Sequence, residues 1–246
     1  MSDVDPADIA RFAAARAAVL DRIERACSRA GRDPAAVALV AVSKTVPPER
    51  VRAALEAGQT VFGENRVQEA ADKRPLVGGG TWRLVGPLQG NKARRAVETF
   101  DTIDSVDSLD LAHRLDRIVR EVRDLPADDP VPDERRFPVL LQVNVDADPG
   151  KAGFEPAALR LALPELSGCT ALRLEGCMTI GRLADDPEAA RPTFRALREL
   201  AMALRTAEPR LGPELSMGMS DDYPVAVEEG ATIVRVGRAL FGDRRA

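Results

Sequence analysis

The feature that most constrains the fold of this chain is a repeated alternation between a short apolar run and a helix-like segment. The first unit begins at residues 37–43, VALVAVS, a continuous run rich in β-branched residues. Such a run is typical of a strand that is buried on both faces, as in a parallel sheet. The segment PPERVRAALEA follows, with Pro48 near the start of a predicted helix and Gly58 just past its end. Each strand of the predicted sheet is therefore followed by a helix.

The same unit recurs along the chain and predicts about eight strands in all. The further strands are expected at residues 60–64, 81–86, 102–106, 138–145, 172–180, 214–218 and 232–237. An amphipathic helix over residues 6–30, which ends at Gly31, precedes the first strand. Longer helices are expected over 108–122 and 186–206, and the helix before the strand at 172–180 is expected to break near Pro164.

These units predict an α/β fold, a (β/α)8 TIM barrel with an extra N-terminal helix. The length of 246 residues fits the ~250 residues typical of such barrels. We expect one domain over residues 1–246, with the helix at about 6–30 and the barrel at about 35–243. The main alternative, a doubly wound open sheet, would be favoured by a GxGxxG motif after the first strand, and the sequence has none there. The Pro- and Asp-rich segment 125–136 is interpreted as a surface loop, because the strand–helix alternation resumes directly after it.

The composition argues against several classes of protein. The net charge is −4 and no long basic block is present, which disfavours nucleic-acid binding. The sequence shows no N-terminal signal pattern and no apolar run approaching ~20 residues, so we expect a cytoplasmic protein that binds no membrane. Cys27, Cys169 and Cys177 form no CxxC pair and are expected to be reduced and buried. The single histidine, His113, is expected on the surface of a helix, and one histidine cannot build a His-rich metal site.

The distribution of lysine gives the first functional signal. Only four of the 35 basic residues are lysines: Lys44, Lys73, Lys92 and Lys151. Lys44 directly follows the first predicted strand, and in TIM barrels the active site lies at the carboxyl ends of the strands. A lysine at this place, in a chain that otherwise uses arginine, is expected for its amine. Partial burial lowers the pKa of an amine and allows it to form a Schiff base with a carbonyl compound.

The loops after the last two strands predict an anion site near this amine. They carry the small residues Ser216, Gly218, Ser220 and Gly237, and in many barrels these loops bind phosphate. Arg235 lies two residues before Gly237, so the alternation of a strand directs both into the barrel. A lysine, a phosphate cradle and a buried polar partner together describe a site for pyridoxal 5′-phosphate (PLP).

Each of these residues also has an ordinary structural interpretation. Lys44 could face solvent at the rim of the barrel, and Arg235 could pair with a carboxylate such as Glu64. The segment from Ser216 could be only a turn that leads to a helix cap. Further structural interpretations concern polar residues near strand ends: Ser220 as an N-cap with Asp221 and Asp222 in the first helical turn, Asn65 as a helix cap, Lys151 as a solvated loop residue, and Lys92 as part of a basic helix face.

Seven segments carry a more specific signal: AVSKTVP, VFGENRVQEA, WRLVGPLQGNKAR, IDSVDSLDLAHRL, LLQVNVDADPGKAGF, GCMTIGRL and LSMGMSDDYPVAVEEGATIVRVGRALFG. In this order, from about residue 35 to 243, they resemble the pyridoxal phosphate homeostasis protein family. That family in turn resembles the barrel domain of alanine racemase, a PLP enzyme of fold type III.

The resemblance implies a role for each predicted site residue. Lys44 holds PLP as a Schiff base, Asn65 lies beside the cofactor, and Arg235 faces the pyridine nitrogen. The phosphate is contacted, largely through the main chain, by Ser216, Met217, Gly237 and Arg238. The family often has a small hydroxyl residue where this chain has Arg238. A main-chain contact survives that difference, whereas a hydroxyl contact is lost.

The resemblance also bears on whether the chain is an enzyme. A racemase needs two acid/base groups on opposite faces of the substrate α-carbon. In racemases of this fold the second group is a tyrosine of a separate C-terminal domain, but this sequence ends at Ala246 and its only tyrosine is Tyr223. We therefore expect a monomeric PLP-binding protein with little or no catalysis, which hands PLP to apo PLP-dependent enzymes. The open alternatives are an amino-acid racemase that uses Lys44 as a base, and a barrel that binds another phosphorylated metabolite without covalent chemistry.

Overall fold

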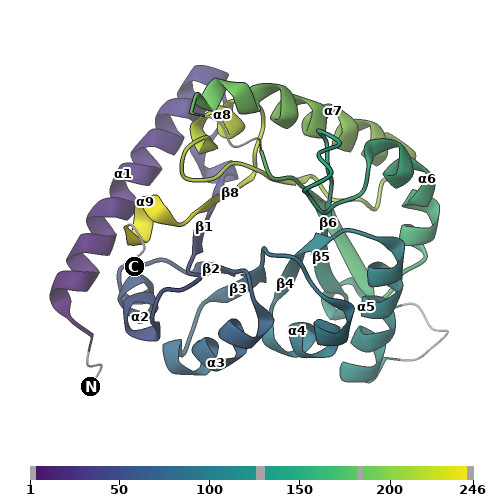
Figure 1. Cartoon of the computed structure of the whole chain (residues 1–246), viewed down its shortest axis with the longest axis horizontal. Helices are drawn as coiled ribbons and strands as arrows, with labels where there is room; N and C mark the ends of the chain where they lie inside the picture. Colours follow the sequence, from purple (N-terminus) through teal and green to yellow (C-terminus); the bar gives the residue numbers. More distant parts are fainter. Residues whose placement is uncertain (1–3, 126–130, 182–184, 243–246) are drawn as a thin grey trace.

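The computed structural model describes residues 4–125, 131–181 and 185–242. Its centre is a closed barrel of parallel strands in sequence order (Figure 1). The strands are β1 (Ala38–Val42), β2 (Val61–Glu64), β3 (Thr81–Leu84), β4 (Thr102–Val106), β5 (Phe137–Gln142), β6 (Leu172–Met178), β7 (Glu214–Ser216) and β8 (Ile233–Val236). The barrel closes where β8 pairs with β1, with Val40 opposite Arg235. The predicted TIM barrel is therefore confirmed, and the open sheet is wrong.

Helices surround the barrel in the described part of the chain. They are α1 (Pro6–Ala30), α2 (Pro48–Glu56), α3 (Val67–Val77), α4 (Ala93–Thr99), α5 (Leu109–Val122), α6 (Pro156–Ser167), α7 (Arg191–Ala207), α8 (Tyr223–Glu228) and α9 (Arg238–Phe241). Short 3-10 turns lie at Pro34–Ala36, Gly90–Lys92, Asp133–Arg135 and Pro187–Ala190.

The extra helix α1 lies along the outside of the barrel beside α2, α8 and α9 (Figure 1). Its start is capped by Asp5, whose carboxylate accepts a hydrogen bond from the Ala7 N–H at 2.9 Å. Its end is set by Gly31, whose φ of +64° suits a residue without a side chain. Phe12 of α1 packs against Phe241 of α9, with ring centroids 5.1 Å apart. The contact between Phe12 and Phe241 joins α1 to the helix that directly follows β8.

The apolar core has two parts. The larger part lies between the strands and the helices and includes Phe62 of β2 and Trp82 of β3. The smaller part fills the inside of the barrel and consists of Val40, Leu140, Met178 and Ile233. Alternate residues of each strand therefore face the helices and the barrel interior.

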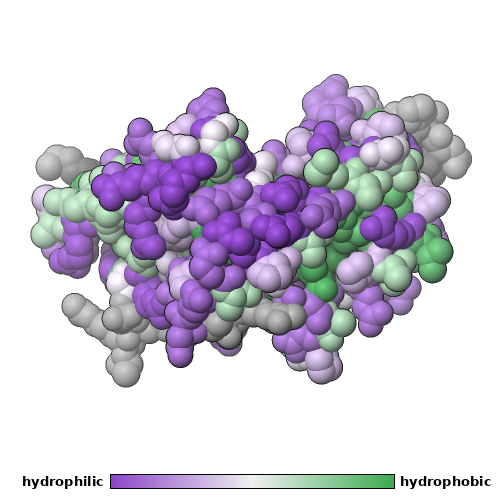
Figure 2. Space-filling model, turned by 90° about the horizontal axis from the view of Figure 1, so that it is seen from above, coloured by the Kyte–Doolittle hydropathy of each residue, from purple (hydrophilic) through white to green (hydrophobic). Residues whose placement is uncertain are grey.

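The surface of the described residues is mainly polar. Figure 2 shows the side of the barrel that carries α7 and α8, which is largely hydrophilic with a hydrophobic area toward the α6 end. The large apolar side chains exposed among the described residues are Leu76, Val122, Leu161 and Met202. None of the described helices is both long and apolar enough to cross a bilayer.

The predictions for cysteine and histidine are confirmed. Cys27, Cys169 and Cys177 are free thiols in buried positions. Burial raises the pKa of both Cys169 and Cys177 to about 12, so neither is a thiolate at neutral pH. The side chain of His113 is 47% exposed on α5, with Nε2 at 3.2 Å from Glu165.

Three local predictions are wrong. Helix α6 continues through Pro164, which lies on its exposed side, where water can solvate the carbonyl group that loses its partner. The helix predicted over 186–206 begins as a 3-10 turn, and α7 starts at Arg191 with Pro192 in its first turn. Ser220 is not an N-cap, because α8 starts only at Tyr223, after Asp222.

Within the loop predicted over 125–136, residues 126–130 lie outside the described residues, as does residue 243 at the predicted end of the barrel.

Candidate functional site

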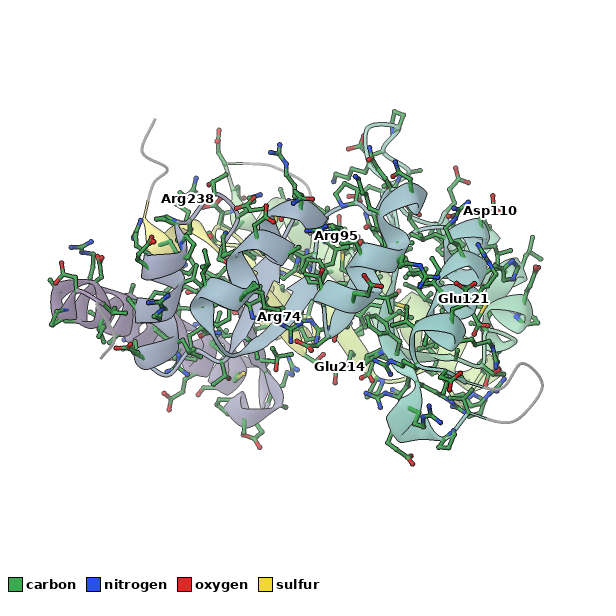
Figure 3. The ribbon with its side chains drawn as sticks, turned by 90° about the horizontal axis from the view of Figure 1, so that it is seen from below. Arg74, Arg95, Asp110, Glu121, Glu214 and Arg238 are labelled. Carbon is green, nitrogen blue, oxygen red and sulfur yellow. The ribbon has the colours of Figure 1, made fainter. Side chains whose placement is uncertain are left out.

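A cleft lies at the carboxyl end of the barrel. In Figure 3, Arg238, which follows β8, lies at the opposite end of the barrel from Glu214, where β7 begins. The cleft has a volume of about 1080 Å³, and Lys44, Gly237 and Arg238 line it together with residues of α1, α2 and α9. The fold therefore brings three of the predicted site residues to one cavity.

Lys44 is half-buried where the chain turns from β1 toward α2. The neighbouring strands fix this turn, because β1 pairs with β8 on one side and with β2 on the other, where Val42 lies opposite Gly63. The next residue, Thr45, has a φ of +64°, a left-handed conformation that β-branched residues rarely adopt. The backbone directly after Lys44 is thus strained and depends on surrounding contacts.

Those contacts come from a group of side chains that we call the Lys73 cluster: Ser43, Glu64, Glu69 and Lys73. The Lys73 side chain is 5% exposed and that of Glu64 is 0% exposed, and their Nζ and Oε1 atoms lie 2.6 Å apart. Lys73 Nζ also donates to Glu69 Oε1 at 2.9 Å and to the Ser43 carbonyl at 2.8 Å. The Ser43 hydroxyl donates to Glu64 Oε1 at 2.7 Å, and the Thr45 N–H donates to Glu69 Oε1 at 2.6 Å.

Burial raises the pKa of Glu64 above its ordinary value, and the hydrogen bonds from Lys73 and Ser43 oppose that shift. The second carboxylate oxygen of Glu64, Oε2, is buried and has no hydrogen-bond partner in the described residues. Lys73 is therefore the cation that makes this buried carboxylate tolerable.

Arg235 of β8 is 5% exposed and connects the end of β7 to the residue that follows β6. Its guanidinium donates to the Ser216 hydroxyl and to the Thr179 carbonyl, both at 2.8 Å. Burial lowers the pKa of Arg235 to about 10, and the charges of Asp104 and Asp222 oppose the shift. Arg235 is thus still protonated at neutral pH. The pairing with Glu64 that the sequence allowed is wrong, because Glu64 bonds to Lys73 instead.

The residues predicted for the phosphate lie at the end of β7 or directly after β7 and β8. Ser216 is fully buried, and Gly237 donates its N–H to the Ser220 hydroxyl at 3.3 Å. The Met217 side chain belongs to the outer core, and its N–H donates to the Ile233 carbonyl at 3.0 Å within the barrel. The main-chain amide of Met217 is therefore used by the sheet in this conformation, and its contact with phosphate stays a prediction.

Glycines allow the close approach of these loops. Gly218 has a φ of +91°, and a Cβ there would lie 2.6 Å from the Ala226 Cβ of α8. A Cβ on Gly237 would lie 3.2 Å from the Val42 carbonyl oxygen, so the absence of a side chain lets the end of β8 lie against β1 beside Lys44.

Arg238 lines the cleft, whereas Asn65 does not. Asn65 is half-buried after β2 and does not occupy the N-cap of α3, which is Arg66, so the capping interpretation is wrong. The Arg238 side chain is 58% exposed and forms an ion pair with Asp221. The roles of both residues beside a cofactor remain predictions.

The remaining lysines and the tyrosine lie in distinct surroundings. Lys92 is exposed beside α4. Lys151 is not a solvated loop residue: its side chain is 21% exposed, and Nζ donates to the carbonyls of Ile180 and Gly181 at 3.2 and 3.1 Å. Tyr223 is fully buried, and the Arg22 guanidinium of α1 lies 5.0 Å from the centre of its ring.

Sequence reasoning missed three features of this region. The signal for Lys73 is its spacing in α3: it lies three residues after Ala70 and four before Val77, on the same buried side of the helix. Asp222 was placed in a helical turn, yet it is 6% exposed and accepts from the Met219 N–H at 2.6 Å. Asp104, in the buried run of β4, pairs with Arg83 at 2.9 Å inside the barrel.

Comparison with known proteins identifies the family of this chain. The family model described as alanine racemase, N-terminal domain, matches residues 15–245. The pyridoxal phosphate homeostasis protein of Pseudomonas aeruginosa is 42% identical over 235 residues, covering 93% of this chain and 94% of that protein. The solved structure of PipY from Synechococcus elongatus with PLP bound is 44% identical, with a TM-score of 0.76, and covers 90% of this chain and 100% of PipY.

A more distant likeness shows the fold alone. Alanine racemase from Clostridium difficile is 15% identical with a TM-score of 0.67, and the match covers 92% of this chain and 56% of the racemase. The family model spans most of the chain, and the Pseudomonas relative is 42% identical over 93% of it. The chain belongs to the pyridoxal phosphate homeostasis protein family.

Proposed function

We propose that this protein binds PLP through Lys44, holds it, and hands it to other proteins, with little or no catalysis of its own. The observation that carries the proposal is the position of Lys44 on the same cleft as Gly237 and Arg238. Arg235 lies buried in β8, two residues before Gly237. PipY, which shares this barrel, has been solved with PLP bound. The donor set of the Lys44 amine, the Arg235 guanidinium and main-chain amides suits an anionic aldehyde.

The residues of the site divide the work of binding. Lys44 would hold PLP through its amine, which could condense with the PLP aldehyde and release water. Ser216 ends β7, and Gly237 and Arg238 follow β8, at the end of the barrel where TIM barrels bind phosphate. We further propose that Asn65 lies beside the ring and that Met217 contributes to the phosphate site.

Arg235 supports a storage role over catalysis. PLP, when bound, supplies an electron sink whose strength depends on a proton at the pyridine nitrogen. Arg235 is protonated at neutral pH and can only donate a hydrogen bond, so a ring nitrogen facing it would carry no proton. PLP held against Arg235 would therefore be a weaker electron sink than PLP protonated at its ring nitrogen.

The single tyrosine supports the same conclusion. A racemase of this fold would need a second acid/base group across the substrate from Lys44. Tyr223 is fully buried beneath Arg22 of α1, and burial raises the pKa of its phenol further above the physiological range. Tyr223 therefore does not offer that second group in this conformation.

The test compares transfer with turnover. The purified protein is loaded with PLP and mixed with an apo form of a PLP-dependent aminotransferase, whose recovered activity reports transfer. In parallel, the loaded protein is incubated with alanine in D2O, and deuterium at the α-carbon is measured by NMR. Transfer without deuterium incorporation supports a carrier. Deuterium incorporation at a rate proportional to protein concentration would show a PLP enzyme instead.

Arg238 gives a prediction that is specific to this chain. We expect Arg238→Ala to change PLP affinity by no more than about fivefold, because exposed ion pairs contribute roughly 1 kcal/mol or less. The residue is 58% exposed and already paired with Asp221. Fluorescence titration with PLP measures the effect, and Asp221→Ala is the matched control. A loss of more than tenfold in Arg238→Ala alone would show that the guanidinium binds the phosphate directly.

A further inference from the structure

We propose that the Lys73 cluster positions the Lys44 amine by fixing both peptide groups that flank the Lys44 Cα. The inference rests on the proposed covalent binding of PLP at Lys44. None of its four side chains lines the cleft, so they act through the backbone of Lys44 and not through contact with a ligand. Glu69 and Lys73 are in this sense positioning residues.

The peptide group before Lys44 is held by Lys73 and its partner Glu64. Lys73 Nζ donates to the Ser43 carbonyl at 2.8 Å. The Ser43 N–H donates to the Gly63 carbonyl at 2.9 Å, and the Ser43 hydroxyl donates to Glu64 at 2.7 Å. The Ser43 carbonyl, which belongs to the Ser43–Lys44 peptide, also accepts from the Val46 N–H at 3.0 Å, so rotation of that peptide plane would break both of its hydrogen bonds.

The peptide group after Lys44 is held by Glu69. Its carboxylate oxygen Oε1 accepts from the Thr45 N–H at 2.6 Å and from Lys73 Nζ at 2.9 Å. This bond offsets the left-handed conformation of Thr45, whose φ is +64°. With both flanking peptides fixed, the direction of the Cα–Cβ bond of Lys44 is fixed as well, and the side chain leaves the backbone toward the cleft.

None of the side chains of the Lys73 cluster lines the cleft. Glu64 follows Phe62 by two residues in β2, so both side chains point away from the barrel axis, and Phe62 packs in the outer core. Lys73 and Glu69 come from α3, which covers that outer side. Lys44 instead lines the cleft together with Val42, which faces the barrel interior beside Gly63. The cluster can therefore be altered without removing any group that lines the cleft.

Glu69 offers the sharpest test, because its two roles can be separated by substitution. Glu69→Ala removes the acceptor for the Thr45 N–H, whereas Glu69→Gln keeps an oxygen at the same place. Asp72→Ala, on the exposed side of the same helix, is the matched control, since Asp72 contacts only Gln68 and Arg95 among the described residues. Lys73 itself is a poorer target, because its loss leaves the Glu64 carboxylate buried and endangers folding.

Three quantities are measured for each variant. The first is the rate of adduct formation with PLP, followed by absorption. The second is the affinity for pyridoxine 5′-phosphate, which carries the phosphate and ring but no aldehyde. The third is amide hydrogen exchange of the peptide covering residues 43–46 without any ligand. We expect Glu69→Ala to slow adduct formation by about 10- to 100-fold, since small misplacements of a reacting group cost this much. Its affinity for pyridoxine 5′-phosphate should stay within about threefold.

The other variants and readouts distinguish positioning from general stability. Glu69→Ala should accelerate exchange at residues 43–46, while Glu69→Gln and Asp72→Ala should resemble the unmodified protein in all three measurements. Equal losses of adduct formation and of pyridoxine 5′-phosphate binding in Glu69→Ala would overturn the inference in favour of a merely structural role. An unchanged rate in Glu69→Ala would overturn it outright. If the unmodified protein forms no adduct, the proposed function fails and the inference falls with it.

Discussion

Replacement of Lys44 by alanine is expected to abolish the adduct that borohydride traps between this protein and PLP. The amine of Lys44 lines the cleft beside Gly237, and no other lysine lines it among the described residues. PLP affinity should fall by at least about tenfold, equivalent to 1.4 kcal/mol, because only noncovalent contacts remain. The free energy of unfolding should change by less than about 1 kcal/mol, since Lys44 is half-buried and lies outside the apolar core.

The small number of lysines makes this experiment easy to interpret. Absorption before and after reduction, followed by mass spectrometry of the peptides, assigns the adduct among only four lysines. Lys92→Ala is the control, because Lys92 is exposed and distant in sequence from both strand ends of the cleft. A trapped adduct on Lys92 or Lys151 in the unmodified protein, with none on Lys44, would contradict the prediction. PLP binding that is equal in the unmodified protein and in Lys44→Ala would point to a noncovalent phosphate site.

The barrel could be predicted from the sequence because each of its strands is buried on both faces. Continuous apolar runs such as residues 37–43 then stand out from the polar helices between them. The strand ends were harder to predict. The run at 138–145 continues past the end of β5 at Gln142, because Val143 forms only an isolated bridge with Phe154 of the next loop. Apolar composition persists there although strand pairing has ended.

The site was predictable where position in the barrel decides the role. Lys44, Gly237 and Arg238 follow strands, and the topology alone places them at the same end. The partner of Arg235 was not predictable, because Glu64 and Asp222 are both carboxylates near strand ends. Only the packing of α3 shows that Glu64 belongs to Lys73. The position of Lys151 also depends on packing between distant segments. The sequence predicts a solvated loop residue, whereas its Nζ donates to the carbonyls of Ile180 and Gly181 after β6.

The buried pair of Lys73 and Glu64 leads to the second large prediction, which concerns stability. Lys73→Met should lower the free energy of unfolding by about 3–5 kcal/mol, because removal of one partner leaves a buried carboxylate without its cation. The Glu64 side chain is 0% exposed, and of its hydrogen-bond partners among the described residues only the Ser43 hydroxyl would remain. Urea denaturation at pH 7 measures the loss. Arg117→Met on α5 is the control, since Arg117 and Glu121 form an exposed pair with the same spacing of four residues as Glu69 and Lys73. It should cost less than about 1 kcal/mol.

The pH dependence and a double variant separate the charge from the packing. Burial already raises the pKa of Glu64, and loss of Lys73 should raise it further. A carboxyl group whose pKa is higher in the folded protein than in the unfolded chain binds a proton on folding. It therefore favours folding at low pH, and this contribution is lost as the pH rises from the unfolded pKa through the folded pKa. The stability deficit of Lys73→Met should therefore shrink between pH 7 and pH 5. Adding Glu64→Gln should recover part of the loss at pH 7, so the two substitutions together cost less than their sum. Additive effects, or a deficit independent of pH, would mean that Lys73 stabilises the fold by packing of its alkyl chain and not by its charge.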